Sequence, residues 1–281
     1  MIVYLNGEFL PLEEAQVSVL DRGFIFGDGV YEVIPVYGGH LFRQEAHLQR
    51  LDNSLKGIKL ENPLTNAEWI EHLETLVHRN NGGDQSIYLQ VTRGPAKRDH
   101  NFPEKVTPTV FMMSDPIKAQ PSPSNGVKAI TTCDTRWQCC NIKSIALLAN
   151  VLLRRRAIEV GAAETILIRD GYVMEGAVSN VFIVIDGVAI TPPKSQFILP
   201  GITRDLILEA MRDANLPCRE ANIPEAQLRT AQEIWLTSST REILPVIMLD
   251  DKPIGMEKPG AIWTSVWQIY QAYKQKLRAN G

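Results

Sequence analysis

The sequence predicts an α+β protein made of two domains. Amphipathic helical patterns alternate with hairpin signals in both halves of the 281-residue chain. Between the halves, residues 116–126 are rich in proline and serine, with a closing asparagine and glycine, and have almost no apolar periodicity. We therefore predict a small N-terminal α/β domain over residues 1–115, a linker over residues 116–126 and a C-terminal domain over residues 127–281.

Hairpin turns organise the strands of the first half. Asn6-Gly7 and Gly38-Gly39 each separate short apolar runs, and both dipeptides are typical of tight hairpins because their residues accept positive φ angles. The strands predicted for this half are residues 4–5, 9–10, 31–37, 41–42, 86–92 and 107–113.

Two amphipathic helices are also predicted in the first half. The second begins at Thr65, where Glu68 stands three residues later and completes a capping box. The apolar face of the first helix carries Leu48, Leu51, Leu55 and Ile58, and a polar stripe of His47, Arg50 and Ser54 lies beside it. The buried face of the second helix is predicted to contain Trp69, Ile70, Leu73, Leu76 and Val77.

The second half repeats the same signals. A helix that carries Ile145, Leu148 and Leu152 is predicted to end at Gly161. Asp170-Gly171 and Asp186-Gly187 mark hairpins. The other elements predicted here are strands over residues 165–169, 172–174, 180–185, 233–236 and 243–250, and helices near residues 203–214 and 261–277.

Composition excludes several classes of protein. A net charge of −3 gives no electrostatic footprint for nucleic acid. No stretch of about 18 apolar residues occurs, and the first residues lack a signal-peptide pattern, so neither a membrane segment nor export is expected. The four cysteines have no zinc-type spacing and are typical of reduced thiols in a cytoplasmic protein. The five histidines show no metal-ligand spacing, and no metal is predicted.

Four polar elements carry the candidate chemistry. They are Lys143 within residues 140–144, Glu175 within 175–180, the helix start at residues 201–204 and the hydroxyl-rich run at residues 237–240. Singly, each has an ordinary explanation as a surface charge, a turn or a helix cap. Together they fit pyridoxal phosphate, because a lysine holds the aldehyde as a Schiff base, a carboxylate keeps the ring nitrogen protonated and a helix N-terminus binds phosphate.

The run from Asp21 to Glu32, DRGFIFGDGVYE, makes the chain resemble the fold-type IV pyridoxal-phosphate enzymes, and most of the chain resembles the D-amino acid aminotransferases among them. The resemblance implies a two-domain fold with the active site between the domains. It implies that Lys143 is the catalytic Schiff-base lysine and that Glu175 pairs with the pyridine nitrogen. The residues that it implies for the cofactor phosphate are Arg50, Ile202, Thr203, Ser238 and Ser239.

Substrate binding is expected from the loop over residues 94–100. Arg98 and His100 are similar to the Arg-x-His element with which D-amino acid aminotransferases hold the substrate carboxylate, together with a tyrosine that corresponds to Tyr31. The resemblance implies that this loop enters the neighbouring subunit's site, so a homodimer with shared active sites is expected. Relatives often carry threonine at Ser239 and serines at Ala177-Val178, which leaves open what replaces those hydroxyls here.

The predicted function is PLP-dependent transfer of an amino group between a D-amino acid, such as D-alanine, D-glutamate or D-aspartate, and a 2-oxo acid, with ping-pong kinetics. Handedness follows from geometry, because the lysine breaks only the Cα–H bond on its own face of the cofactor. The position of the carboxylate clamp therefore selects the enantiomer. Three alternatives remain: a branched-chain L-amino acid aminotransferase, a lyase resembling aminodeoxychorismate lyase, and a binding protein in which Lys143 is a surface charge.

Overall fold

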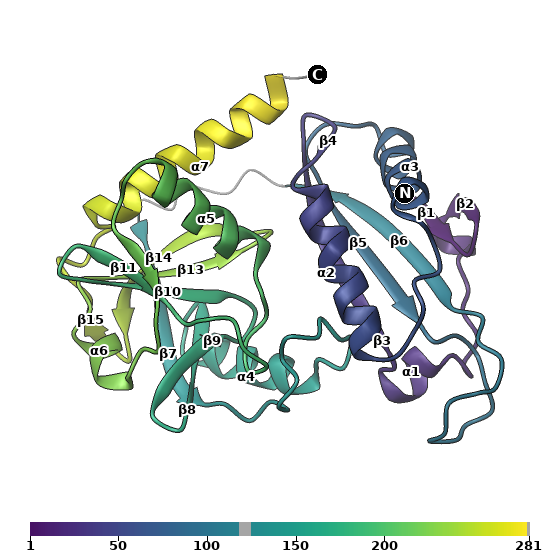
Figure 1. Ribbon diagram of the computed structural model, residues 1–281, viewed down its shortest axis with the longest axis horizontal. Helices are drawn as coiled ribbons and strands as arrows, with labels where there is room; N and C mark the ends of the chain where they lie inside the picture. Colours follow the sequence, from purple (N-terminus) through teal and green to yellow (C-terminus); the bar gives the residue numbers. More distant parts are fainter. Residues whose placement is uncertain (118–124, 280–281) are drawn as a thin grey trace. The chain divides into compact units, whose positions relative to one another are not determined.

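The computed structural model describes residues 1–117 and 125–279 and divides into two compact units (Figure 1). The predicted α+β class is confirmed. Most of the predicted linker, residues 118–124, lies outside the described residues, and the predicted domain boundaries stay a prediction. Unit 1 comprises Met1–Lys118, Ile142–Leu147 and Lys274–Gly281, and unit 2 comprises Ala119–Asn141 and Leu148–Tyr273. Lys143 therefore belongs to unit 1.

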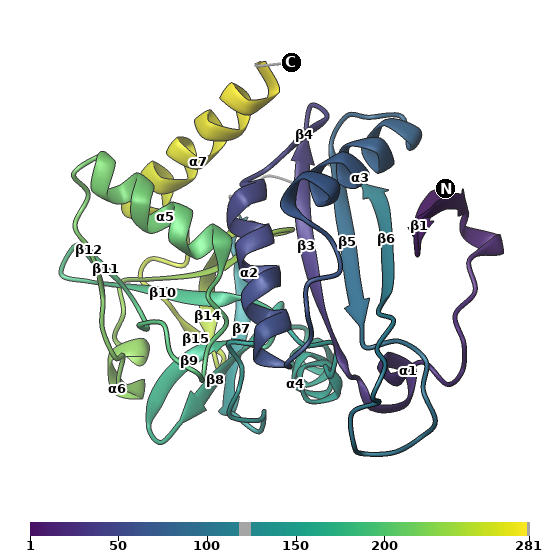
Figure 2. The same cartoon turned by 45° about the vertical axis from the view of Figure 1, so that its right-hand side comes forward.

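Unit 1 is built on an antiparallel six-stranded sheet in the order β2-β1-β6-β5-β3-β4. Figure 2 shows β3, β5 and β6 running side by side. The hairpins predicted at Asn6-Gly7 and Gly38-Gly39 are confirmed, and all four turn residues have positive φ. The strands are β1 (Ile2–Leu5), β2 (Glu8–Pro11), β3 (Gly29–Tyr37), β4 (His40–Leu41), β5 (Gln85–Thr92) and β6 (Thr109–Pro116).

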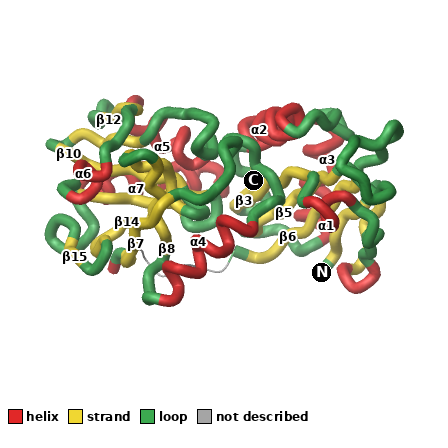
Figure 3. Tube along the Cα trace, turned by 90° about the horizontal axis from the view of Figure 1, so that it is seen from below, coloured by secondary structure: helices red, strands yellow, loops and turns green. Residues whose placement is uncertain are grey.

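Two long helices cover one face of this sheet (Figure 3). The capping box predicted at Thr65 is confirmed: its side chain accepts from the Glu68 N–H at 3.3 Å, and the Glu68 carboxylate accepts from the Thr65 N–H at 2.7 Å. The helices of unit 1 are a 3-10 turn η1 (Leu12–Glu14), α1 (Arg22–Phe26), α2 (Gln44–Gly57) and α3 (Asn66–Arg79).

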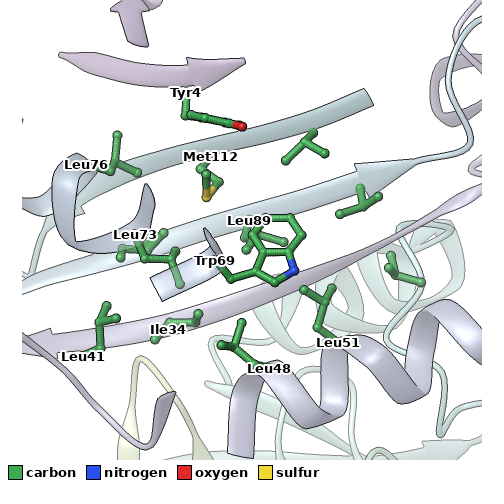
Figure 4. Packing of buried hydrophobic residues seen from close by; sticks show 14 of the residues in the cluster. Tyr4, Ile34, Leu41, Leu48, Leu51, Trp69, Leu73, Leu76, Leu89 and Met112 are labelled. Atoms are coloured by element: carbon green, nitrogen blue, oxygen red, sulfur yellow. The ribbon is translucent and has the colours of Figure 1, made fainter. Parts of the chain in front are cut away.

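The core of unit 1 lies between these helices and the sheet (Figure 4). Trp69 of α3 is fully buried, and its indole N–H donates to Asn62 at 2.9 Å, so the large ring is buried without an unpaired donor. Leucines from the predicted apolar faces of α2 and α3 surround it, with Ile34 of β3 beneath. The apolar faces of α2 and α3 recur at helical spacing because they are buried against the sheet, and that spacing is what predicted both helices.

Unit 2 is built on a nine-stranded mixed sheet in the order β12-β11-β10-β13-β14-β7-β8-β9, with β15 paired to β14. The hairpins at Asp170-Gly171 and Asp186-Gly187 are confirmed. The strands are β7 (Val127–Cys133), β8 (Glu164–Arg169), β9 (Tyr172–Gly176), β10 (Asn180–Ile185), β11 (Val188–Thr191), β12 (Cys218–Glu220), β13 (Glu233–Ser238), β14 (Glu242–Leu249) and β15 (Lys252–Pro253).

The helix predicted around Ile145 is wrong at its start. It begins at Leu148, and Ile145 instead donates its N–H to the Gly29 carbonyl, because residues 143–145 pair with the start of β3. The described residues include no helix long and apolar enough to span a membrane. The helices of this half are α4 (Leu148–Glu159), α5 (Ile202–Asp213), α6 (Glu225–Arg229) and α7 (Ala261–Ala279). The last residues of α7, from Lys274 onward, belong to unit 1.

Candidate functional site

Lys143 lies beside Tyr31 in unit 1. Its carbonyl accepts from the Tyr31 N–H at 2.9 Å, and its own N–H donates to the Ser54 hydroxyl of α2 at 3.2 Å. Its ammonium nitrogen lies 4.2 Å from the centre of the Tyr31 ring. Backbone pairing with β3 therefore fixes where the lysine amine projects, and it brings together two of the predicted site residues.

Arg50 is held by a carboxylate that sequence reasoning assigned no role. Its Nε and Nη2 donate to the two oxygens of Glu32 at 2.7 Å each, and His47 Nδ1 lies 2.8 Å from the same carboxylate. Burial raises the pKa of Glu32, but the Arg50 and His47 contacts outweigh it and hold the pKa well below its usual range. Glu32 thus stays ionised and fixes the Arg50 guanidinium in a bidentate pair.

Arg98 and His100 gather on one aromatic ring of unit 1. The Arg98 guanidinium carbon lies 5.5 Å from the centre of the Phe26 ring, and the His100 ring centre lies 5.6 Å from it. Arg98 and His100 are both exposed in the single chain. Tyr31, the third predicted substrate residue, instead stacks on Tyr88 at 5.7 Å.

Glu175 is a buried acid in unit 2. It lies near the end of β9, and its oxygens accept from Arg136 Nη1 at 2.5 Å, Asn180 Nδ2 at 3.0 Å and the Leu199 N–H at 3.0 Å. Burial raises the pKa of Glu175 to about 7, against the opposing charge of Arg136. A carboxylate with this pKa exchanges a proton near neutral pH, and a nearby cation favours its ionised form.

Sequence reasoning missed Arg136. Asp134 accepts from its Nε and Nη2 at 3.0 Å each, so the guanidinium bridges Asp134 and Glu175. The only sequence signal was the spacing of two residues between Asp134 and Arg136, which places two side chains of an extended segment on one side. The second acceptor of Arg136, Glu175, is 39 residues away in the chain, and only folding brings it near.

The predicted anion site lies at the N-terminus of α5. Gly201 is its N-cap, and no side chain caps the helix, so the first N–H groups remain for a ligand. A Cβ at Gly201 would lie 1.9 Å from the side-chain oxygen of Asn180, so a larger residue there would have to displace the Asn180 side chain. Ile202 and Thr203 follow and are buried.

The buried hydroxyl of Thr237 is a second feature that favours a ligand near the N-terminus of α5. The Thr237 Oγ1 atom is buried and has no hydrogen-bond partner among the described residues. Thr237 of β13 lies directly opposite Asn180 of β10, so their side chains project from the same face of the sheet. A buried polar atom without a partner costs free energy, and a phosphate oxygen would satisfy it. The predictions for this run named Ser238 and Ser239 but not Thr237.

The other hydroxyls near these elements have identifiable environments. Ser238 ends β13 and accepts from the Arg241 N–H at 3.2 Å, while Ser239 lies in the turn that follows. Ser179 donates to the Glu164 carboxylate at 3.1 Å. Ala177 is buried and its N–H donates to the Thr165 carbonyl at 2.9 Å. The Ser179 hydroxyl is therefore occupied within the protein.

Comparison with known protein families shows to which family the chain belongs. The family model described as amino-transferase class IV matches residues 29–248, more than half of the chain. The chain belongs to the class IV aminotransferases. The matched range includes Lys143, Glu175, the N-terminus of α5 at Gly201 and Thr237 of β13.

Individual class IV aminotransferases are similar over almost their whole length. D-alanine aminotransferase of Bacillus licheniformis is 41% identical over 272 residues, 96% of each chain. The structure of the Escherichia coli branched-chain amino acid aminotransferase has a TM-score of 0.92 and 27% identity, and the match covers 96% of this chain and 93% of that one. The PLP-bound form of a hypothetical aminotransferase from Mycobacterium tuberculosis has a TM-score of 0.84 and 26% identity, over 97% of this chain and 98% of its own.

Proposed function

We propose that this class IV aminotransferase uses pyridoxal phosphate to move an amino group between a D-amino acid, of the D-alanine type, and a 2-oxo acid. The observation that carries the proposal is 41% identity to a D-alanine aminotransferase along 96% of both chains. The exposed pair Arg98 and His100 on the Phe26 ring supports it, since this is the expected carboxylate clamp.

The residues present fit the cofactor. The uncapped α5 terminus and the Thr237 hydroxyl, which has no hydrogen-bond partner in the described part of the chain, suit its phosphate. The ionisable, buried Glu175 suits its ring nitrogen. The other proposed phosphate contacts are Arg50, Ile202, Thr203, Ser238 and Ser239. When bound, pyridoxal phosphate supplies an aldehyde that condenses with amines and a ring that accepts the electrons left on the substrate Cα.

Each side chain then has a defined role. The Lys143 amine would hold the cofactor and would take the proton from the substrate Cα, so one group would serve as anchor and base. The charge of Arg136 lowers the pKa of Glu175, and a protonated ring nitrogen facing Glu175 would lower it further. Glu175 would therefore be ionised when the cofactor is bound. Arg98, His100 and Tyr31 hold the substrate carboxylate, and the side of the pocket on which they hold it sets the enantiomer that presents its Cα–H to Lys143.

A substrate panel tests the proposal. With 2-oxoglutarate as acceptor, we expect initial rates with D-alanine to exceed those with L-alanine and L-leucine by about tenfold or more, because an arginine–carboxylate contact contributes roughly 1.5–3 kcal/mol. Arg98→Ala should raise KM for D-alanine by about 10- to 100-fold and leave cofactor binding unchanged.

Two outcomes of this panel would replace the proposal. Preference for L-leucine would favour a branched-chain aminotransferase, the activity named for the Escherichia coli structure with a TM-score of 0.92. Release of pyruvate from an amino-containing substrate without any 2-oxo acceptor would favour the lyase alternative.

We also propose a homodimer with shared sites. Leu148, Val151 and Leu152 of α4 are 72%, 60% and 58% exposed, and their spacing forms one apolar stripe on the helix. Val19 and Phe24 in unit 1 are exposed as well. Apolar patches of this kind mark association surfaces, and a second copy of the chain is the partner that the clamp requires.

Mixed dimers test the sharing of sites. Lys143→Ala and Arg98→Ala chains should each form impaired homodimers, but a heterodimer would contain one site with both Lys143 and Arg98 intact. We expect activity with D-alanine at low concentration to rise when the two variants exchange subunits, to about half the wild-type value per heterodimer. Native mass spectrometry of differently tagged chains verifies exchange. Heterodimers no more active than their parents would place Arg98 in its own chain's site.

A further inference from the structure

The loop that carries the clamp is tied to α1 by one buried arginine. Arg22, whose side chain is 5% exposed, donates from Nη1 to the carbonyls of Asp99 at 2.7 Å and Asn101 at 3.3 Å. These two carbonyls flank His100. A guanidinium is a rigid planar fork with five donors, so one arginine fixes two points of a loop in a way that lysine cannot reproduce.

Asp28 holds this arginine in place. Its Oδ2 accepts from Arg22 Nε at 2.8 Å, and its two oxygens also accept from Arg93 at 2.8 and 3.0 Å. Burial raises the pKa of Asp28, but the two guanidinium groups outweigh it and lower the pKa. Arg93 directs its other donors to the carbonyls of Ile58 and Lys59. The two arginines therefore share a carboxylate but stabilise different segments.

Phe26 supports the same loop through side chains. The Arg22 guanidinium carbon lies 4.8 Å from the centre of its ring, on which Arg98 and His100 also rest. Backbone bonds complete the attachment: the Arg22 N–H donates to the Gly94 carbonyl at 3.0 Å and the Ala96 N–H to the Leu20 carbonyl at 3.1 Å. Residues 94–101 are thus bound along their length to the segment around α1.

We propose that Arg22 is a positioning residue for substrate specificity, acting through residues 98–101 rather than by contact with substrate. By fixing the carbonyls on both sides of His100, it orders an otherwise exposed loop before the substrate carboxylate arrives. A loop that is ordered in advance loses less conformational entropy on binding, so the clamp binds more tightly. This inference rests on the proposed function, which makes Arg98 and His100 the clamp.

Arg22→Met provides the first measurement. The substitution removes both loop hydrogen bonds and keeps most of the buried volume, while Arg93 still neutralises Asp28. In the holoenzyme we expect KM for D-alanine and the inhibition constant of propionate, a carboxylate without an amino group, to rise together by about tenfold, with kcat within about threefold of wild type. Amide hydrogen exchange in a peptide that covers residues 96–102 should become faster.

A double-mutant comparison separates positioning from general stability. In a chain that already carries Arg98→Ala and His100→Ala, Arg22→Met should raise KM by less than about twofold, because no clamp remains to position. An equal rise in both backgrounds, or unchanged KM and exchange in the single variant, would overturn the positioning role. If Arg98→Ala and His100→Ala themselves leave KM unchanged, it is the proposed clamp, and with it the proposed function, that fails.

Two further variants serve as controls. Arg79 lies over the Phe9 ring at 4.6 Å, outside the loop and the segment around α1, and Arg79→Met should change neither KM nor exchange in residues 96–102. If Arg22→Met does not fold, Arg22→Lys keeps a cation beside Asp28 but lacks the planar fork that bonds to both carbonyls, and it carries the same prediction of raised KM with preserved kcat. Wild-type KM in a folded Arg22→Lys protein would then contradict the proposal.

Discussion

Replacing Lys143 by alanine is expected to lower transamination of D-alanine by about 10⁴-fold or more, because the covalent anchor and the base are lost together. The fold should survive, since the backbone of Lys143, which bonds to Tyr31 and to Ser54, is unchanged. Initial rates with 2-oxoglutarate measure the loss. Borohydride reduction followed by peptide mass spectrometry should find the cofactor on Lys143 in the wild type and on no lysine in the variant.

A matched lysine is the control for this experiment. Lys56 is exposed and forms a surface ion pair with Asp52 at 2.7 Å, so Lys56→Ala should leave turnover and cofactor attachment unchanged. Normal turnover in Lys143→Ala, or a cofactor trapped on another lysine in the wild type, would refute the assignment of Lys143.

Glu175→Gln is expected to slow removal of the substrate Cα proton by about 10²-fold, because a neutral amide stabilises a protonated ring nitrogen less than a carboxylate does. Asp134 still pairs with Arg136, so the guanidinium is not left without a counter-charge. Single-turnover rates with D-alanine, protonated or deuterated at Cα, measure this step. An unchanged rate, with cofactor bound, would mean that Glu175 is not the partner of the ring nitrogen.

The same variant should change the pH dependence of stability in the cofactor-free protein. Burial raises the pKa of Glu175 from 4.5 to about 7, so the folded chain keeps a proton there that the unfolded chain has released. Stability from this group is therefore present below pH 4.5 and falls as pH rises towards 7. Between about pH 5 and 8, Tm of the wild type should fall more than Tm of Glu175→Gln. Parallel curves would contradict the buried, proton-binding state.

Local signals were sufficient for much of the fold. Asn6-Gly7 and Asp186-Gly187 form the predicted hairpins because their turn chemistry is a property of the dipeptide itself. The Thr65 capping box is equally local. Strand β7, Val127–Cys133, was not predicted, since it is defined by parallel pairing with β14 and β8, which lie far away in sequence. The helix start near Ile145 was misplaced for the same reason.

The candidate site likewise has features that the sequence determined and features that depend on contacts between distant segments. Sequence alone determined the residue types: an amine at Lys143, an acid at Glu175, and a helix start at Gly201 that favours an anion. It also identified the run from Asp21 to Glu32 as a marker of the family, without a role for each member.

Only the tertiary structure decided which partners the buried polar side chains contact. Arg22 bonds to carbonyls 77 and 79 residues away, Glu32 fixes Arg50, and Arg136 reaches Glu175 across 39 residues. The Thr237 hydroxyl is distinctive only because it is buried without a partner among the described residues. Turn and capping preferences are set by neighbours in the chain, whereas the pairing of buried charges depends on which distant segments folding brings into contact.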